Sequence, residues 1–386
     1  MVQRKNKKRE HLGEKHDSFI RLSKPYFGEI KEITSCIEDI LESGYIIQGK
    51  YVAEFESLVA EYLGVKYAVA VSSGTSALHL SLIALGIGAG DGVIVPAYTF
   101  PATVNVIELV GAKPVLVDVD IETYNLKVKD ISKFVSPKTK AVLPVHLFGN
   151  PADMEEISDV AKFYGLKIIE DAAGALGATY DGKKCGTFGE VGCFSFHPRK
   201  IISTGEGGIV ATNNYEIAEK IRLLRNHGMR SDKYGRYDFF TVGFNYRMNE
   251  LEAVLGINQM KKIHQILEER HKIYSIYFDL MRGIDEIEFQ KSIPKSNPVW
   301  QAFVVRLKKH TNAELIEKLR AEGIEANIGT YAVHLLEFYK KKYNYKPDDF
   351  PNASELFTRS LALPFYNGIT RREISKVVDV LRRHLL

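Results

Sequence analysis

The chain has 386 residues, of which 45% are hydrophobic and 26% are charged, as is typical of a globular protein with an ample apolar core. Its net charge of +4 is small beside 52 basic and 48 acidic residues, so we expect no nucleic acid partner. No apolar run reaches the roughly 18 residues of a membrane helix, and the 3 cysteines show no metal-ligand spacing. We therefore expect a cytoplasmic protein without a membrane segment or a bound metal.

The chain begins with a basic stretch, MVQRKNKKREHLGEKH, that lacks apolar periodicity. Because no apolar region follows it, we do not interpret it as a secretory signal. We interpret residues 1–25 as a flexible, solvated N-terminal arm. A contact between this arm and nucleic acid is the less favoured alternative.

Residues 26–250 are predicted to form a large α/β domain. Short apolar runs alternate there with helical or loop segments, as in a mostly parallel sheet that is buried on both faces. The runs are YAVAVS, GVIVPAYTF, PVLVDVD, AVLPVHLFG and LKIIED.

Residues 251–386 are predicted to hold a long connecting helix and a smaller α+β domain. Periodic apolar residues over 249–283 predict one long helix, and AFVVRL at 302–307 reads as a strand. Two further helices are predicted over 313–323 and 371–385.

Lys200 lies in a short polar loop between two apolar runs, VGCFSF and GGIVATN, that are typical of strands. Pro198 ends the first run, and Gly205, Gly207 and Gly208 allow a tight return path. The loop therefore presents Lys200 at the edge of a core. A solvated lysine on a hairpin is the alternative for this residue taken alone.

The stretch VSSGTSALHL predicts a strand followed by a helix that begins near Thr75. The free N–H groups and the dipole of such a helix start attract anions, and Ser72, Ser73 and Ser76 add hydroxyl donors. Simple N-capping by Ser or Thr is compatible with this interpretation.

Asp171 follows the apolar run LKIIE, at the end of a strand where open α/β sheets bind ligands. A carboxylate buried there without a partner would be costly, so it should meet a cation or cap the following turn. A phosphate site, a carboxylate and a lysine together match pyridoxal phosphate, which carries a phosphate, a ring nitrogen and an aldehyde.

The motifs in this order resemble the DegT/DnrJ/StrS family of sugar aminotransferases. The resemblance runs from about Tyr26 to the end of the chain and includes SSGTSALHL, IEDAAGALGA, GCFSFHPRKIISTGEGG and GFNYRMNELEAVLG. It implies the aspartate-aminotransferase-like fold, which is fold type I among enzymes that use pyridoxal phosphate.

The resemblance also implies roles for single residues in cofactor binding. Lys200 would form the Schiff base with the cofactor, and Asp171 would pair with the pyridine nitrogen. Thr75, Ser76 and Ser195 would donate to the phosphate.

Other matched motifs imply that Phe100 stacks on the cofactor ring and that Asn245 reaches the phosphate of the neighbouring subunit. Asn245 therefore implies a homodimer with composite active sites. The candidates for substrate contacts are His197, His227, Arg230 and His334. For each histidine, a packed or surface position is the alternative.

The family resemblance implies an aminotransferase that uses L-glutamate to convert a nucleotide-linked keto-sugar, of the 4-keto-6-deoxy type, into an amino sugar for glycan synthesis. The chain departs from the family at Gly174, where relatives carry glutamine or histidine beside the cofactor. A cyclitol or another cyclic ketone as acceptor, or a non-catalytic regulatory protein, are the alternatives.

Overall fold

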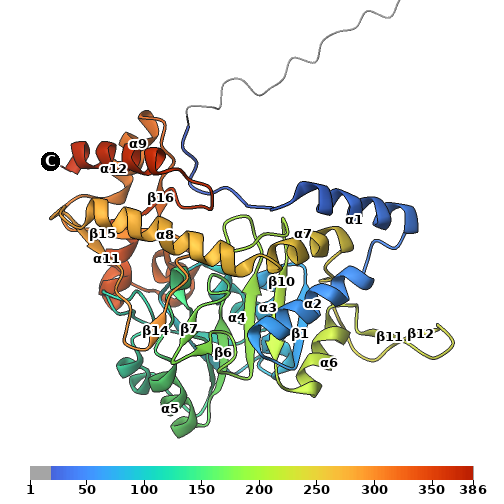
Figure 1. The fold of residues 1–386 in the computed structure, drawn as a ribbon. Coiled ribbons are helices and arrows are strands. Elements are labelled where there is room, and N and C mark those ends of the chain that lie inside the picture. Colours follow the sequence, from blue (N-terminus) through green and yellow to red (C-terminus); the bar gives the residue numbers. More distant parts are fainter. Residues whose placement is uncertain (1–18, 386) are drawn as a thin grey trace, which may run out of the picture.

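The computed structural model describes residues 19–385, which fold around a seven-stranded sheet with the order β1-β10-β9-β6-β5-β2-β4 (Figure 1). Neighbouring strands are parallel except where β10 runs antiparallel to β1 and to β9. The predicted α/β fold with a mostly parallel sheet is thus confirmed. The strands are β1 (Tyr67–Val71), β2 (Gly92–Pro96), β4 (Lys113–Val117), β5 (Thr139–Val142), β6 (Lys167–Asp171), β9 (Val191–Ser195) and β10 (Gly208–Thr212).

Helices cover both faces of this sheet, which explains why its strands are apolar without alternation. One face packs against α3 (Gly74–Ala84), α4 (Ala102–Leu109) and α6 (Tyr215–Leu224). The other face packs against α2 (Lys50–Leu63), α5 (Met154–Tyr164) and α7 (Glu250–Met260), and α1 (Ile30–Ser43) lies beside α7.

The single helix predicted over 249–283 is interrupted. The structure has α7 up to Met260 and a second helix, α8 (Ile263–Met281), after a break at Lys262, whose φ is −116° and ψ is 13°. The break has a tertiary cause, because α7 packs on α2 over the large sheet while α8 packs on α12 (Arg371–Leu385). The apolar periodicity continues through both helices, so the pattern alone could not reveal the change of direction.

A smaller antiparallel sheet follows, with the order β13-β15-β18-β16. Its strands are β13 (Ile287–Phe289), β15 (Phe303–Leu307), β16 (Asn327–Ile328) and β18 (Ser360–Leu363), and α8, α9 (Asn312–Ala321) and α12 share its apolar cluster. This arrangement confirms the smaller α+β part. Ile20, from the segment predicted as a flexible arm, is buried in the same cluster, whereas residues 1–18 of that arm lie outside the described residues.

The C-terminal segment also returns to the large sheet. The strand β17 (Tyr331–Ala332) pairs with β3 (Tyr98–Thr99), and α11 (Pro351–Arg359) packs beside β3, after α10 (Glu337–Tyr343). The remaining strands are β7 (Thr179–Tyr180), β8 (Lys183–Lys184), β11 (Met229–Ser231), β12 (Tyr237–Phe239) and β14 (Ser296–Asn297). A domain boundary near residue 250 therefore remains a proposal. Among the described residues, no helix combines the length and apolarity that a membrane crossing requires.

Glu250 ties α7 to the start of α2. Its buried carboxylate accepts hydrogen bonds from the backbone N–H groups of Gly49 at 2.8 Å, Tyr51 at 2.9 Å and Val52 at 3.0 Å. These donors are orphan groups of the α2 N-terminus, where negative charge is also favoured by the helix dipole. Glu250 thus caps a helix about two hundred positions away in sequence.

We expect Glu250→Ala to lower the free energy of unfolding by about 3 kcal/mol, because it leaves buried N–H groups without acceptors. Guanidinium denaturation measures this change. The matched control is Glu54→Ala on α2, whose exposed pair with Lys261 spans 3.4 Å and should contribute less than about 1 kcal/mol. Equal losses in the two variants would contradict the capping role.

Candidate active site

The loop that carries Lys200 is closed by hydrogen bonds at both ends. The N–H of Phe196 donates to the carbonyl of Gly207 at 2.9 Å, and the N–H of Thr204 donates to the carbonyl of Phe196 at 2.9 Å. Within the loop, the N–H of Lys200 donates to the carbonyl of His197 at 2.9 Å. The antiparallel pairing of β9 with β10 therefore presents Lys200 on a defined turn, as the sequence predicted.

Asp171 ends β6, and its side chain is 95% removed from solvent, since the residue is 5% exposed. One carboxylate oxygen accepts from the hydroxyl of Thr103 at 2.8 Å, and the other accepts from the N–H of Ala173 at 3.1 Å. The carboxylate therefore caps the following turn. Burial lowers the pKa of Lys200, and the positive charge of Arg199 lowers it further. The negative charge of Asp171 partly opposes both effects.

Thr103 was not identified from the sequence. It lies in the first turn of α4, and its hydroxyl also contacts that of Thr99 at 3.1 Å. The only local signal was the spacing of four residues between Thr99 and Thr103, which by itself does not indicate a functional site. Its contact with Asp171 depends on the packing of α4 against the sheet, which the local pattern does not specify.

The start of α3 forms a cradle of hydroxyl groups. Ser73 caps the helix by accepting from the N–H of Ser76 at 3.0 Å, and the hydroxyls of Ser72 and Ser76 lie 3.0 Å apart. A Cβ on Gly74 would lie 2.7 Å from the Cβ of Ser195, so glycine permits the close approach of β9 to this helix start. Thr75 is exposed at the same place. Capping and anion binding are thus compatible here.

The segment that holds Asn245 is fixed beside this cradle. The N–H of Ser72 donates to the carbonyl of Tyr246 at 2.9 Å, and the Tyr246 hydroxyl lies 3.3 Å from Nδ1 of His79. Asn245 itself is exposed. Phe100, which follows β3, is 60% exposed and meets Tyr331 edge-on at 6.2 Å between ring centroids. Both side chains are therefore open to a ligand or a partner.

The four substrate candidates lie in different surroundings. Nδ1 of His197 accepts from the N–H of Arg199 at 3.2 Å, in the Lys200 loop, and burial lowers its pKa. His227 has a left-handed φ of 56° and lies beside the Asn245 segment, since its N–H donates to Phe244 at 2.8 Å.

The other two candidates have partners of their own. Arg230 pairs with Glu219 of α6 at 2.8 Å. His334 is fully buried, its Nε2 lies 2.9 Å from the hydroxyl of Ser354, and burial lowers its pKa. These contacts do not bring Arg230 or His334 to Lys200, and their roles stay predictions.

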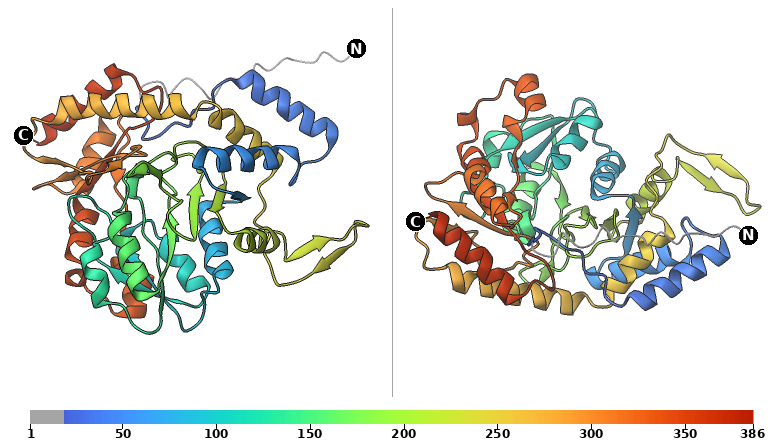
Figure 2. Two further views of the ribbon diagram at one scale, coloured as in Figure 1. Left: turned by 60° about the horizontal axis from the view of Figure 1, so that its bottom comes forward. Right: turned by 90° about the horizontal axis from the view of Figure 1, so that it is seen from above.

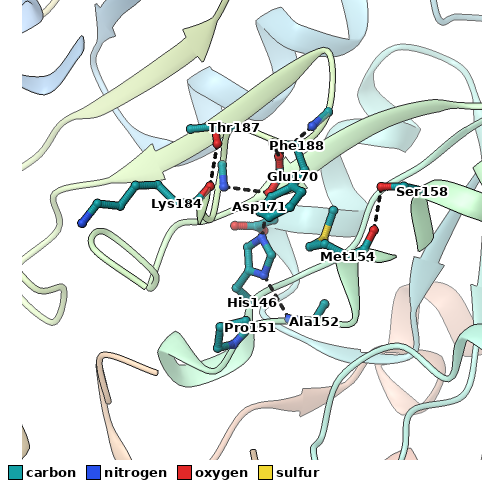
Figure 3. A network of polar contacts seen from close by, with 12 residues as sticks. His146, Pro151, Ala152, Met154, Ser158, Glu170, Asp171, Lys184, Thr187 and Phe188 are labelled. Carbon is teal, nitrogen blue, oxygen red and sulfur yellow. Dashed lines mark hydrogen bonds and ion pairs between the residues drawn. The ribbon is translucent and has the colours of Figure 1, made fainter. Parts of the chain in front are cut away.

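A buried network supports β6 immediately before Asp171 (Figure 3). Glu170 accepts from the N–H groups of Gly186 at 2.7 Å, Phe188 at 2.6 Å and Gly189 at 2.8 Å, and it lies 3.0 Å from Nε2 of His146. Nδ1 of His146 accepts from the N–H of Ala152 at 3.1 Å, so Nε2 carries the proton and donates to Glu170. This network fixes the strand whose end carries Asp171.

These groups fit pyridoxal phosphate by the chemistry of their donors and acceptors. The α3 start and the serine hydroxyls suit a phosphate, the buried Asp171 carboxylate suits a protonated ring nitrogen, and the Lys200 amine suits an aldehyde. Strand pairing places Asp171 opposite Cys193, two positions before Ser195. The α3 start lies against Ser195 and the Lys200 loop follows it, so the phosphate site, the carboxylate and the lysine loop lie at one edge of the sheet. The fold and this site define a pyridoxal phosphate-dependent enzyme of fold type I.

The chain belongs to the DegT/DnrJ/EryC1/StrS aminotransferase family, whose sequence model matches residues 28–382. The GDP-perosamine synthase of Caulobacter vibrioides is 40% identical over 342 residues, which are 88% of this chain and 91% of that protein. The spore coat polysaccharide biosynthesis protein SpsC of Bacillus subtilis is 36% identical and covers 96% of this chain and 98% of its own length. The crystal structure of S. venezuelae DesV in complex with a ketimine intermediate has a TM-score of 0.86 at 34% identity, with 94% of this chain and 99% of that chain covered.

The lowered pKa of Lys200 predicts a pH-dependent stability of the apoprotein. Between the lowered pKa and the ordinary value of 10.5, the unfolded chain binds more protons than the folded chain, so the free energy of unfolding rises with pH. Lys200→Met removes this contribution. We expect Lys200→Met to be more stable than the wild type at neutral pH. This difference in the free energy of unfolding should shrink as pH rises through the window, by about 1.4 kcal/mol for each unit by which the pKa of Lys200 is lowered.

Guanidinium denaturation of both apoproteins at a series of pH values measures the difference, in which the other titrating groups cancel. A gap between the two proteins that stays constant from neutral pH to 10.5 would show that burial does not perturb this amine.

Proposed function

We propose that this aminotransferase moves an amino group from L-glutamate to the keto group of a nucleotide-linked sugar of the 4-keto-6-deoxy type. The product would be an amino sugar for polysaccharide or glycan synthesis. The observation that carries the proposal is the loop between β9 and β10, which presents Lys200 at the sheet edge where the buried Asp171 carboxylate ends β6. The similarity to a GDP-perosamine synthase and to a spore coat polysaccharide protein supports the substrate class.

The residues that would hold pyridoxal phosphate follow from the donor set. The α3 start with Thr75 and Ser76, together with Ser195, would bind the phosphate, and Asp171 would bind the ring nitrogen. Phe100 would lie against the ring. When bound, pyridoxal phosphate supplies an electron sink for a carbanion beside the transferred nitrogen.

Lys200 would have two tasks in this chemistry. Its amine would attach the cofactor. After the substrate amine has displaced it, the same amine would take a proton from the alpha carbon of the amino donor and give it to the carbon of the cofactor's aldehyde group. A base for this task must be uncharged part of the time near neutral pH, and the burial that lowers the pKa of Lys200 favours that state. The hydroxyl of Thr103 would keep Asp171 oriented, because it donates to the carboxylate at 2.8 Å.

Arginines near the site are candidates for the donor carboxylate or the sugar diphosphate. Arg199 is exposed next to Lys200. Arg247 donates to Asn226 at 2.7 Å through one terminal nitrogen, while its buried Nε has no hydrogen-bond partner. A ligand oxygen at Nε would satisfy this donor, so Arg247 is the stronger candidate of the two.

The alternatives differ from this proposal in the acceptor or in turnover. A cyclitol or another cyclic ketone would need no cationic contact for a diphosphate. A regulatory protein would have no use for a lysine whose loop lies at the sheet edge where a buried carboxylate ends β6, so Lys200 and Asp171 favour catalysis. The cytoplasmic location expected from the sequence stays a prediction.

The acceptor can be identified with a half-reaction. Protein loaded with pyridoxal phosphate is treated with L-glutamate, freed of the excess, and mixed with one ketone at a time, while its visible absorbance is followed. We expect the absorbance to return with nucleotide-linked 4-keto sugars and not with uncharged cyclic ketones. Lys200→Ala is the control and should show no cycle, because it lacks the amine.

Two outcomes would count against the proposal. If uncharged cyclic ketones alone restore the absorbance, the acceptor is a cyclitol-like ketone. If the wild-type protein never responds to glutamate, the amino donor is wrong.

We also propose that the protein is a homodimer in which Asn245 reaches the site of the partner subunit. The hairpin of β11 and β12 projects from the body of the molecule (Figure 2). It carries exposed aromatic residues, and Val242 after it is 86% exposed. Tyr45, Ile46 and Ile47 are also exposed, and Ile47 forms a bridge to Asn249, close to Asn245 in sequence. Exposed apolar side chains gathered on such segments are typical of a protein interface.

We expect Val242→Glu to raise the dissociation constant of the dimer by about thirtyfold or more, because a charge would be buried in the interface. Analytical ultracentrifugation over a range of concentrations measures it. The matched control is Phe163→Glu on α5, an exposed aromatic residue outside this surface. A wild-type monomer, or equal behaviour of both variants, would refute the interface.

A further inference from the structure

Gly174 has a neighbour that explains why no side chain is present there. If Gly174 carried a Cβ, the three heavy atoms nearest to it would all belong to Gln301. They are Oε1 at 3.2 Å, and Cβ and Cγ, both at 3.5 Å. Gly174 is not among the glycines with positive φ, so its backbone does not require glycine. The space above Gly174 is therefore taken by a side chain from a segment far away in sequence.

The carboxamide of Gln301 has a defined orientation. Its Nε2 donates to the carbonyl oxygen of Arg199 at 2.6 Å. A carbonyl oxygen can only accept, so the amide nitrogen must face Arg199 and the amide oxygen must face Gly174. Gln301 thus holds the carbonyl of the residue that precedes Lys200, while its amide oxygen packs over the turn that follows Asp171.

The backbone of Gln301 is fixed from two sides. Its N–H donates to the carbonyl of Phe148 at 2.8 Å, and its carbonyl accepts from the buried Arg270 of α8 at 2.7 Å. Arg270 also donates to the carbonyl of Trp300 at 3.1 Å. Trp300 has a left-handed φ of 49°, a costly conformation for a bulky residue that persists only where its surroundings enforce it.

We infer that Gln301 is a positioning residue for the active-site lysine. Its carboxamide anchors the Lys200 loop to a backbone segment that is itself fixed, and the glycine at 174 leaves the room that this carboxamide needs. This inference rests on the proposed use of Lys200 and Asp171 in binding pyridoxal phosphate. It also accounts for the absence of the glutamine or histidine that the family resemblance implies at position 174.

The first test removes the donor and keeps the shape. Gln301→Met is matched in length but has no N–H to offer Arg199. We expect the dissociation constant of pyridoxal phosphate from the apoprotein to rise about fivefold, the change for loss of one hydrogen bond worth about 1 kcal/mol. We also expect a change in the visible absorption band of the loaded protein, which reports the surroundings of the Lys200 bond to the cofactor. The melting temperature of the apoprotein should not change.

The second test uses the contact between the two positions. In the wild-type background, Gly174→Ala should weaken cofactor binding, because the new Cβ displaces the carboxamide. In a Gln301→Ala background, the same substitution should cost nothing further, since Oε1 and Cγ are gone. This coupling distinguishes displacement of Gln301 from a general effect of alanine at 174.

The outcomes separate this inference from the proposed function. If the wild-type apoprotein binds pyridoxal phosphate but Gln301→Met binds it equally well with the same absorption band, the positioning role is wrong and the function stands. An equal effect of Gly174→Ala in both backgrounds would overturn it too. If the wild type does not bind pyridoxal phosphate, both proposals are wrong.

Discussion

Two opposite charges in a poorly hydrated place organise this site. The Asp171 carboxylate would be costly to bury alone, and so would the Lys200 ammonium. The carboxylate is stabilised by donors from Thr103 and Ala173, and its charge opposes the effect of burial on the pKa of Lys200. The amine is therefore kept within the field of a carboxylate while burial still favours its neutral form. A site that binds a charged ring and moves protons needs both conditions.

The antiparallel strand β10 makes this meeting possible. A parallel connection after β9 would require a crossover of a dozen or more residues, which would leave only the first end of the loop at this edge of the sheet. Because β10 returns directly beside β9, both ends of the Lys200 loop are fixed at the edge where β6 ends with Asp171. The His146 and Glu170 network then holds β6 against the segment around Gly186 (Figure 3). The antiparallel direction of β10 thus places Lys200 at the same edge of the sheet as Asp171.

Local sequence patterns predicted the parts of this site that local structure creates. The apolar runs gave the strands, and their ends gave Asp171 and the loop of Lys200. The partners of these residues could not be read in the same way. Thr103 reaches Asp171 from 68 positions away, and Gln301 reaches Arg199 from 102 positions away. Such contacts depend on how helices and loops pack, and similarly the break at Lys262 follows from the different surfaces that α7 and α8 cover.

Gly174 shows why a motif should be interpreted together with the space around it. The family resemblance implies a glutamine or histidine at this position, so glycine there suggests a pocket with one donor fewer. In the folded chain, a carboxamide from Gln301 lies over that position, with its backbone clamped by Arg270 and its nitrogen on Arg199. The space over position 174 is thus filled from another segment, and glycine leaves room for that side chain. The two positions constrain one another, so a substitution at either one has an effect that depends on the other.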